Sequence, residues 1–244
     1  ARANYDIIVS EPSNPWMAGV GSLFSNEFYH DARRRLKPGG VMAQWVHLYE
    51  MDDETLRLIL RTFIANFPEA SLWGINGTDV LLIGSEEPID LDWRRLQEHF
   101  EQPSVKAWFE KAGVRSVPAA LSMQILSNKT LRDAAGKGPL NTDQHPRLEY
   151  AAPRAQYRGD FALLPFQRDD RLTSPGRVLL VLARYIEQRG KELSSREFSD
   201  IIWTLRSRRE RPASKVFFEG WIAVDPRGAK AELNRMLAEL ESKK

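Results

Sequence analysis

The first residues whose side chains could take part in a reaction follow a short apolar run, Tyr5–Ser10. Glu11, Asn14 and Trp16 lie there in a loop that two prolines stiffen. A carboxylate can take a proton from an amine or orient it, and an amide can accept one N–H while donating elsewhere. Because open α/β sheets place ligands at the carboxyl ends of their strands, we predict a site with Glu11 as its acid. A polar loop with a surface acid is the simpler alternative.

Two further groups carry polar side chains. Gln44 lies in an apolar segment, where a buried amide needs partners, so we expect it to contact a ligand. His47 follows in the same segment and could act as a base, although a single histidine is more often structural. Asn141, Asp143 and His145 belong to a polar loop of the kind that lines sites, or that closes as an Asx turn.

Strands and helices alternate in the part of the chain that must position these residues. The β-branched run Tyr5–Ser10 predicts a buried strand of a parallel sheet. Ser25 is expected to cap a helix that Lys37–Gly40 ends, and Asp52 or Asp53 is expected to cap the next helix. Further strands are expected at residues 41–49, 70–76 and 80–84, the last two as a hairpin. This order predicts an α/β fold, as the C-terminal half of a Rossmann-like sheet that ends in an antiparallel pair.

The remainder is predicted to be mainly helical. Residues 88–138 have a helical pattern, and the polar loop at 139–153 is expected to run into a short strand. Further helices are expected over residues 176–189, 195–210, 213–224 and 228–242. Ser194 and Glu197 have the spacing of a capping box. We therefore predict two domains, a methyltransferase-like part over residues 1–153 and a helical C-terminal extension over residues 154–244.

Composition narrows the function classes. Apolar residues make up 42% of the 244 residues and charged residues 28%, which argues against fibrous and low-complexity proteins. The chain has no cysteine, so disulfides and thiolate metal sites are excluded. Its four histidines form no metal-binding motif, and no metal is expected. No apolar run approaches the ~20 residues of a membrane-spanning helix. The net charge of +2, with roughly six positive charges in excess after residue 150, gives no strong nucleic-acid signal.

A combined pattern resembles the C-terminal half of the catalytic domain of the spermidine synthase (polyamine aminopropyltransferase) family, and particularly its divergent bacterial members fused to a membrane domain. It consists of YDIIVSEPSNPW, EFYHDARRRLKPGG, VMAQW, LWGINGTDVLLIGS and NTDQHPRLEYAAP. The resemblance covers about residues 4–153 and leaves the helical tail outside.

The resemblance implies aminopropyl transfer from decarboxylated S-adenosylmethionine to a polyamine-type amine, on a methyltransferase-like sheet. Glu11 falls on the family's catalytic acid, and Asn14 falls on a second acid that pairs with the amine. Gln44 falls on a substrate-adjacent glutamine, while Asn141 and His145 keep the family's spacing. Asp143 lies between them, and Trp16 would form a wall of the amine site.

Several expectations follow from the positions at which this sequence departs from the family's pattern. Asn14 removes one negative charge, and Pro139 and Leu140 stand where the family has paired tyrosines. The glycine-rich cofactor loop is expected before residue 1, so the chain is expected to be a piece of a longer, cytoplasmic or membrane-attached protein. The family commonly forms homodimers. An S-adenosylmethionine-dependent methyltransferase and a non-catalytic relative remain open as alternatives.

Overall fold

The computed structural model describes residues 4–89 and 91–241, and the chain forms two compact units. Unit 1 comprises Ala1–Asp90 and Gln124–Asp170, and unit 2 comprises Leu91–Met123 and Arg171–Lys244. Residue 153, where we predicted the first domain to end, lies inside a helix of unit 1. The segment 91–123 groups with the C-terminal helices.

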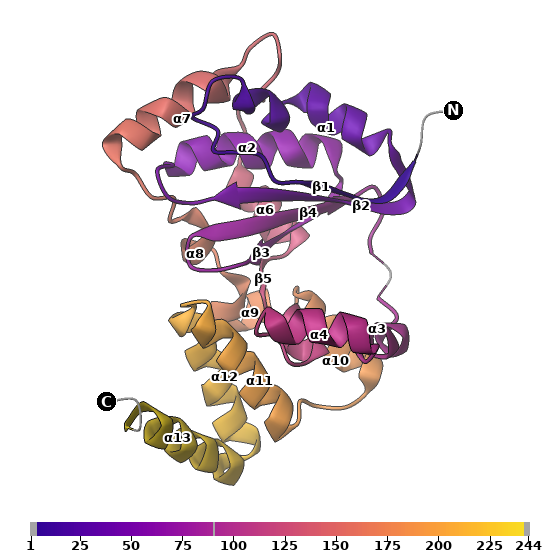
Figure 1. The fold of residues 1–244 in the computed structure, drawn as a ribbon, viewed down its shortest axis with the longest axis vertical. Helices are drawn as coiled ribbons and strands as arrows, with labels where there is room; N and C mark the ends of the chain where they lie inside the picture. The colour runs from indigo at the N-terminus through magenta and orange to yellow at the C-terminus, as the bar shows by residue number, and fades with distance from the viewer. Residues whose placement is uncertain (1–3, 90, 242–244) are drawn as a thin grey trace. The chain divides into compact units, whose positions relative to one another are not determined.

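Unit 1 is an α/β layer structure, which confirms the predicted fold class (Figure 1). Its strands are β1 (Tyr5–Ser10), β2 (Leu36–His47), β3 (Glu69–Gly74), β4 (Asp79–Ser85) and β5 (Gln124–Leu126). Its helices are η1 (Val20–Phe24), α1 (Asn26–Arg33), α2 (Asp53–Asn66), α6 (Asn128–Ala135), α7 (Arg147–Arg158) and α8 (Leu164–Gln167). The sheet has the order β1-β2-β4-β3-β5, in which β1 and β2 are parallel and the other pairs are antiparallel.

Helix α2 packs on one face of this sheet and forms the centre of the core. Apolar residues at helical spacing form a buried stripe along α2, with Leu56, Ile59 and Phe63 at 0% exposure. Asp52 is the residue that caps the helix, because its side chain accepts the N–H of Thr55 at 2.7 Å. Helices α1 and α6 contribute further buried residues to the same core.

Strand β1 occurs where it was predicted, but the expectation that it is buried is wrong. It lies at the edge of the sheet, and Ile7 and Val9 are 63% and 66% exposed. These two side chains share one face of the strand, because side chains alternate along it. The apolar run correctly predicted a strand that pairs in parallel. The described residues do not cover the face that carries Ile7 and Val9.

The segment Lys37–Gly40, expected to end a helix, belongs to the first part of β2. Helix α1 already ends at Arg33, and the pairing of β1 with β2 shifts between Tyr5 and Ile7. Gly40 is required by close backbone approach, since a Cβ there would lie 3.1 Å from the carbonyl oxygen of Tyr5. The Pro-Gly-Gly sequence therefore forms an irregularity within the strand pairing.

Two elements differ from the expectations. The short strand expected near residue 153 is wrong, because α7 is a helix that buries Leu148, Ala152 and Ala155 at helical spacing. The sequence analysis did not predict this helix, because Pro153 lies within it and proline normally breaks helices. Strand β5 was missed because it has only three residues, all buried, between helices.

Unit 2 is helical in the part of the chain that the structure describes. Its helices are α3 (Trp93–Phe100), α4 (Pro103–Lys111), α5 (Val117–Leu121), α9 (Ser174–Arg177), α10 (Val181–Arg189), α11 (Ser195–Ser207), α12 (Arg211–Val224) and α13 (Pro226–Glu241). The short helix η2 (Asp170–Leu172) lies where the chain passes between the units. No helix of the described residues has the length and apolar character needed to cross a membrane.

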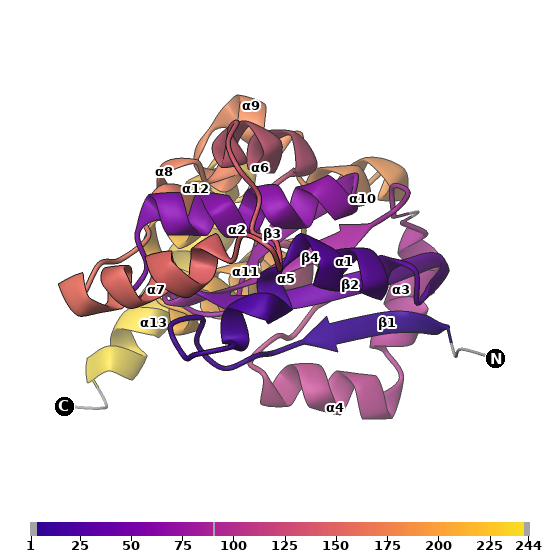
Figure 2. The ribbon, with the colours of Figure 1, turned by 90° about the horizontal axis from the view of Figure 1, so that it is seen from above.

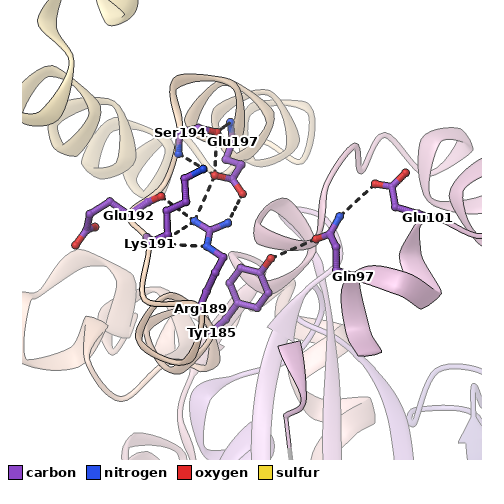
Figure 3. Close-up of polar contacts among 8 residues, drawn as sticks. All are labelled: Gln97, Glu101, Tyr185, Arg189, Lys191, Glu192, Ser194 and Glu197. Carbon is purple, nitrogen blue, oxygen red and sulfur yellow. Dashed lines mark hydrogen bonds and ion pairs between the residues drawn. The ribbon is translucent and has the colours of Figure 1, made fainter. Parts of the chain in front are cut away.

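One arginine connects α10 to the start of α11 (Figure 3). Arg189 pairs with Glu197 and donates to the carbonyl oxygen of Glu192 at 2.8 Å. Glu197 also accepts the N–H of Ser194 at 2.8 Å, which confirms the predicted capping box. Tyr185 of α10 donates to Gln97 of α3 at 3.3 Å. These contacts join the end of α10 to the start of α11 and join α10 to α3, so the network has a structural role.

Candidate functional site

The predicted acid lies at the carboxyl end of β1. Glu11 is exposed, and its carboxylate has no hydrogen-bond or ion-pair partner among the described residues. The preceding Ser10 is the register partner of Gln44 in β2, and Gln44 Nε2 donates to the Ser10 carbonyl oxygen at 3.4 Å. Gln44 therefore helps to hold the strand end from which Glu11 projects.

The side-chain amide of Gln44 is buried, and its nitrogen and oxygen differ in their hydrogen bonding. Its Nε2 also donates to the carbonyl oxygen of Trp45 at 3.0 Å, whereas its Oε1 has no hydrogen-bond partner in the part of the chain that the structure describes. Leaving a buried acceptor unpaired costs about 1–3 kcal/mol. This oxygen could accept one N–H, and the ligand contact expected of Gln44 stays a prediction.

The loop after Glu11 places Asn14 and Trp16 in different environments. Asn14 is half-buried, and its carbonyl oxygen accepts the N–H of Met17 at 3.0 Å. Its side-chain amide has no partner in the part of the chain described here. Trp16 is also half-buried and packs edge-on against His47, with ring centroids 4.7 Å apart, and against Tyr49 at 6.1 Å.

His47 is buried among aromatic rings and is 1% exposed. Neither ring nitrogen has a hydrogen-bond partner among the described residues. Burial lowers the pKa of His47 to about 4, and the nearby Asp79 carboxylate only partly opposes this effect. His47 is therefore neutral at pH 7, and one of its nitrogens remains an available acceptor.

The two faces of the sheet separate these candidates. Residues of β2 alternate between faces, so Gln44 lies on the face of Met42 and Val46, which belong to the core. His47 lies on the opposite face and contacts Trp16, which also packs against the core. The structure thus brings His47 and Trp16 together, whereas the side chains of Gln44 and His47 point to opposite faces of the sheet.

Asn141 is committed to contacts within its own chain. Its Nδ2 donates to the carbonyl oxygens of Gly21 at 2.9 Å and Phe24 at 3.2 Å. Its Oδ1 accepts the N–H of Leu148 at 3.0 Å, and the side chain is buried. Asn141 therefore fastens η1 to the start of α7, and this places the loop that carries Asn14 and Trp16.

The other two residues of that loop point to solvent. Asp143 is exposed, and its backbone N–H donates to Glu27 of α1 at 3.0 Å. His145 is exposed, and its backbone N–H donates to Thr142 Oγ1 at 3.0 Å, so the loop closes as a local turn. Among the described residues, neither side chain forms a hydrogen bond or ion pair with Glu11 or Gln44.

Sequence reasoning missed Asp79 and Tyr49. Asp79 is the cross-strand register partner of His47, and its Oδ1 is buried without a partner. Its Oδ2 accepts Asn76 Nδ2 at 2.6 Å, so the hairpin turn holds it in place. The antiparallel hairpin was predicted, and pairing its register with residues 41–49 would have identified Asp79 opposite His47.

The described residues contain no group of three or more histidine, aspartate or glutamate side chains placed to hold a metal ion. Two other sets of side chains could bind a ligand. One is the acceptor set of Glu11, Gln44 and Asn14 near the end of β1, which suits an amine. The other is the neutral imidazole of His47 with Asp79 and the ring of Trp16, which suits an apolar or cationic group.

Comparison with known proteins finds a similarity over part of the chain. No protein-family model matches the chain. A region of 99 residues is 31% identical to the polyamine aminopropyltransferase of Moorella thermoacetica, which covers 37% of this chain. The chain spans about a third (35%) of the length of that curated relative. This similarity agrees with the resemblance drawn from the sequence and supports a spermidine-synthase-like relationship for part of the chain.

Proposed function

We propose that this protein alkylates an amine, by transferring an aminopropyl group from decarboxylated S-adenosylmethionine to a polyamine-type acceptor. The observation that carries the proposal is the acceptor set at the end of β1. The Glu11 carboxylate is exposed without a partner among the described residues, and the neighbouring Gln44 has a buried, unpaired Oε1. The similarity to a polyamine aminopropyltransferase supports the same chemistry.

The proposed step is a direct displacement. The amine nitrogen donates its lone pair to the methylene carbon next to the sulfonium, and the carbon–sulfur bond breaks. The sulfur keeps the electron pair of the broken carbon–sulfur bond and leaves as part of a neutral thioether. The new secondary ammonium then loses one proton to Glu11 or to water. Because the sulfonium is already a good leaving group, the protein mainly supplies orientation and an unprotonated amine.

The remaining candidates have supporting roles in this proposal. Asn14 and Gln44 would contact the acceptor amine, and Trp16 would form an apolar wall. We assign Asn141 a positioning role, because its amide already has three partners within the chain. Asp143 and His145 are exposed and would contact substrate only at the rim.

The neutral Asn14 has a consequence for the acceptor. An ionic contact at ~4 Å is worth ~4 kcal/mol at an effective dielectric of 20, before desolvation costs. An amide cannot supply this attraction to a second ammonium group. We therefore expect the preferred acceptor to carry less positive charge than a linear diamine.

Methyl transfer from S-adenosylmethionine is the second candidate. It is favoured by the segment Asn14-Pro15-Trp16, in which an amide and a ring follow a strand end, as in amine methyltransferases that hold an amino group. The two candidates differ in the donor, and the same assay separates them.

The test uses the natural protein that carries this sequence, with both donors and a panel of mono- and diamines. Product analysis by mass spectrometry distinguishes an added aminopropyl group from an added methyl group. Glu11→Gln should lower kcat at least tenfold, while the matched control Glu87→Gln, also exposed, should not change it. Full activity of Glu11→Gln refutes the assigned role, and absence of binding by either donor favours a non-catalytic protein.

A further inference from the structure

A second site candidate lies on unit 1, between the N-terminal half of α2 and one face of α7. The two helices are neighbours in both views (Figure 1 and Figure 2). A surface pocket of about 300 Å³ opens between them. Pockets of this size hold small-molecule ligands. The pocket does not include Glu11, Gln44 or the aromatic rings around His47, so it is separate from the site described above.

Four arginines line this pocket, which we call the arginine pocket. They are Arg61 of α2 and Arg147, Arg154 and Arg158 of α7. The three on α7 lie on one face of the helix, because their spacing of seven and four residues corresponds to two turns and one turn. Leu58 and Ala151 add an apolar part to the lining.

Two carboxylates in the lining are already neutralised. Asp52 pairs with Arg158, and Glu54 pairs with Arg61. Burial alone would raise the pKa of Asp52, but hydrogen bonds from Thr55 and Arg158 outweigh it and lower the pKa. Within the lining, four arginines against two carboxylates leave two positive charges, and Asp160, outside the lining, gives Arg158 a second partner.

Those two charges belong to Arg147 and Arg154. Both are exposed, and neither has an ion-pair or hydrogen-bond partner for its guanidinium among the described residues. Arg147 is also the first residue of α7, where the helix dipole is positive and a basic side chain does not stabilise the helix. An anion placed there would gain from the dipole and from both guanidinium groups.

The opposite wall is rigid. Arg61 is buried, and it donates to the carbonyl oxygens of Ala135 at 3.1 Å and Pro139 at 3.2 Å. The backbone at Gly138 passes close to its guanidinium, because a Cβ there would lie 2.9 Å from Arg61 Cζ. A ligand would therefore meet one fixed wall and two free arginines.

We propose that the arginine pocket binds a small organic phosphate ester, with its phosphate between Arg147 and Arg154 and its organic part against Leu58 and Ala151. A phosphate monoester carries about −1.5 to −2 charges at pH 7, which matches the two uncompensated arginines. Arginine presents parallel N–H donors that fit phosphate oxygens in pairs. The apolar lining favours an ester over the free ion.

The test is calorimetric titration of the protein with phenyl phosphate and, separately, with inorganic phosphate. Phenyl phosphate should bind the wild-type protein more tightly than inorganic phosphate does. Arg154→Gln should weaken binding of phenyl phosphate about tenfold or more, because a charged hydrogen-bond donor is lost. The double variant Arg147→Gln/Arg154→Gln should abolish it. Both variants should fold normally, as circular dichroism can verify, since the substituted side chains are exposed.

The matched control is Arg34→Gln/Arg168→Gln, which removes two exposed arginines of unit 1 outside the pocket. It should bind phenyl phosphate as the wild-type protein does. Absence of binding to the wild-type protein, an equal loss in the control, or equal affinity for inorganic phosphate would each overturn the proposal. Tighter binding of a thymidine decanucleotide, with the same sensitivity to Arg154→Gln, would overturn it in favour of a nucleic-acid backbone.

Discussion

Asn141 allows a structural role to be separated from a direct substrate contact. Its buried side chain joins η1 and α7 through three hydrogen bonds, to Gly21, Phe24 and Leu148. Asn141→Ala leaves two carbonyl oxygens and one N–H without these partners. Each buried, unpaired polar group costs about 1–3 kcal/mol. We therefore expect a loss of about 3 kcal/mol or more in the free energy of unfolding of unit 1.

Urea unfolding followed by tryptophan fluorescence measures this loss, since Trp16 and Trp45 report on unit 1. Asp143→Ala is the matched control in the same loop, because its side chain is exposed and its change should stay within about 0.5 kcal/mol. If Asn141→Ala left the unfolding free energy unchanged but weakened donor binding, our assignment of a positioning role would be refuted.

Three further predictions concern buried or capping groups. Tyr29 has a fully buried hydroxyl without a partner, so Tyr29→Phe should raise the unfolding free energy by about 1 kcal/mol, measured in urea. The folded-state pKa of His47, about 4, lies below its ordinary value of 6.5, so unfolded chains bind more protons in that interval. Stability should therefore fall by up to about 3 kcal/mol as the pH drops from 6.5 to 4. His47→Phe should flatten this part of the pH profile of urea unfolding, and an unchanged slope would contradict it. Ser194→Ala removes half of the capping box of α11 and should cost about 1 kcal/mol, seen as faster amide exchange at Glu197.

Local patterns predicted much of unit 1. The apolar stripe of α2, its cap at Asp52 and the cap of α1 at Ser25 depend on neighbouring residues, so periodicity and spacing reveal them. The hairpin of β3 and β4 has the same local origin. The helix α7 was missed because Pro153 gives a local signal that burial of Leu148 and Ala155 overrides.

The candidate site was predicted only in part. The position of Glu11 at a strand end follows from the order of elements, and the burial of Gln44 follows from its apolar neighbours. The full use of Asn141 within the chain could not be predicted, since its partners lie up to 120 residues away. The same holds for the ring of Trp16 against His47.

The sequence by itself determined the helix caps at Ser25, Asp52 and Ser194 and the hairpin of β3 and β4, because those signals act over a few residues. Only the tertiary structure decided that β1 has an open face, that Gln44 and His47 lie on opposite faces of the sheet, and that α2 and α7 bring four arginines together. Hydrophobic periodicity indicates which face of an element is apolar, but it does not indicate which distant element covers that face. That choice depends on packing between segments far apart in the chain.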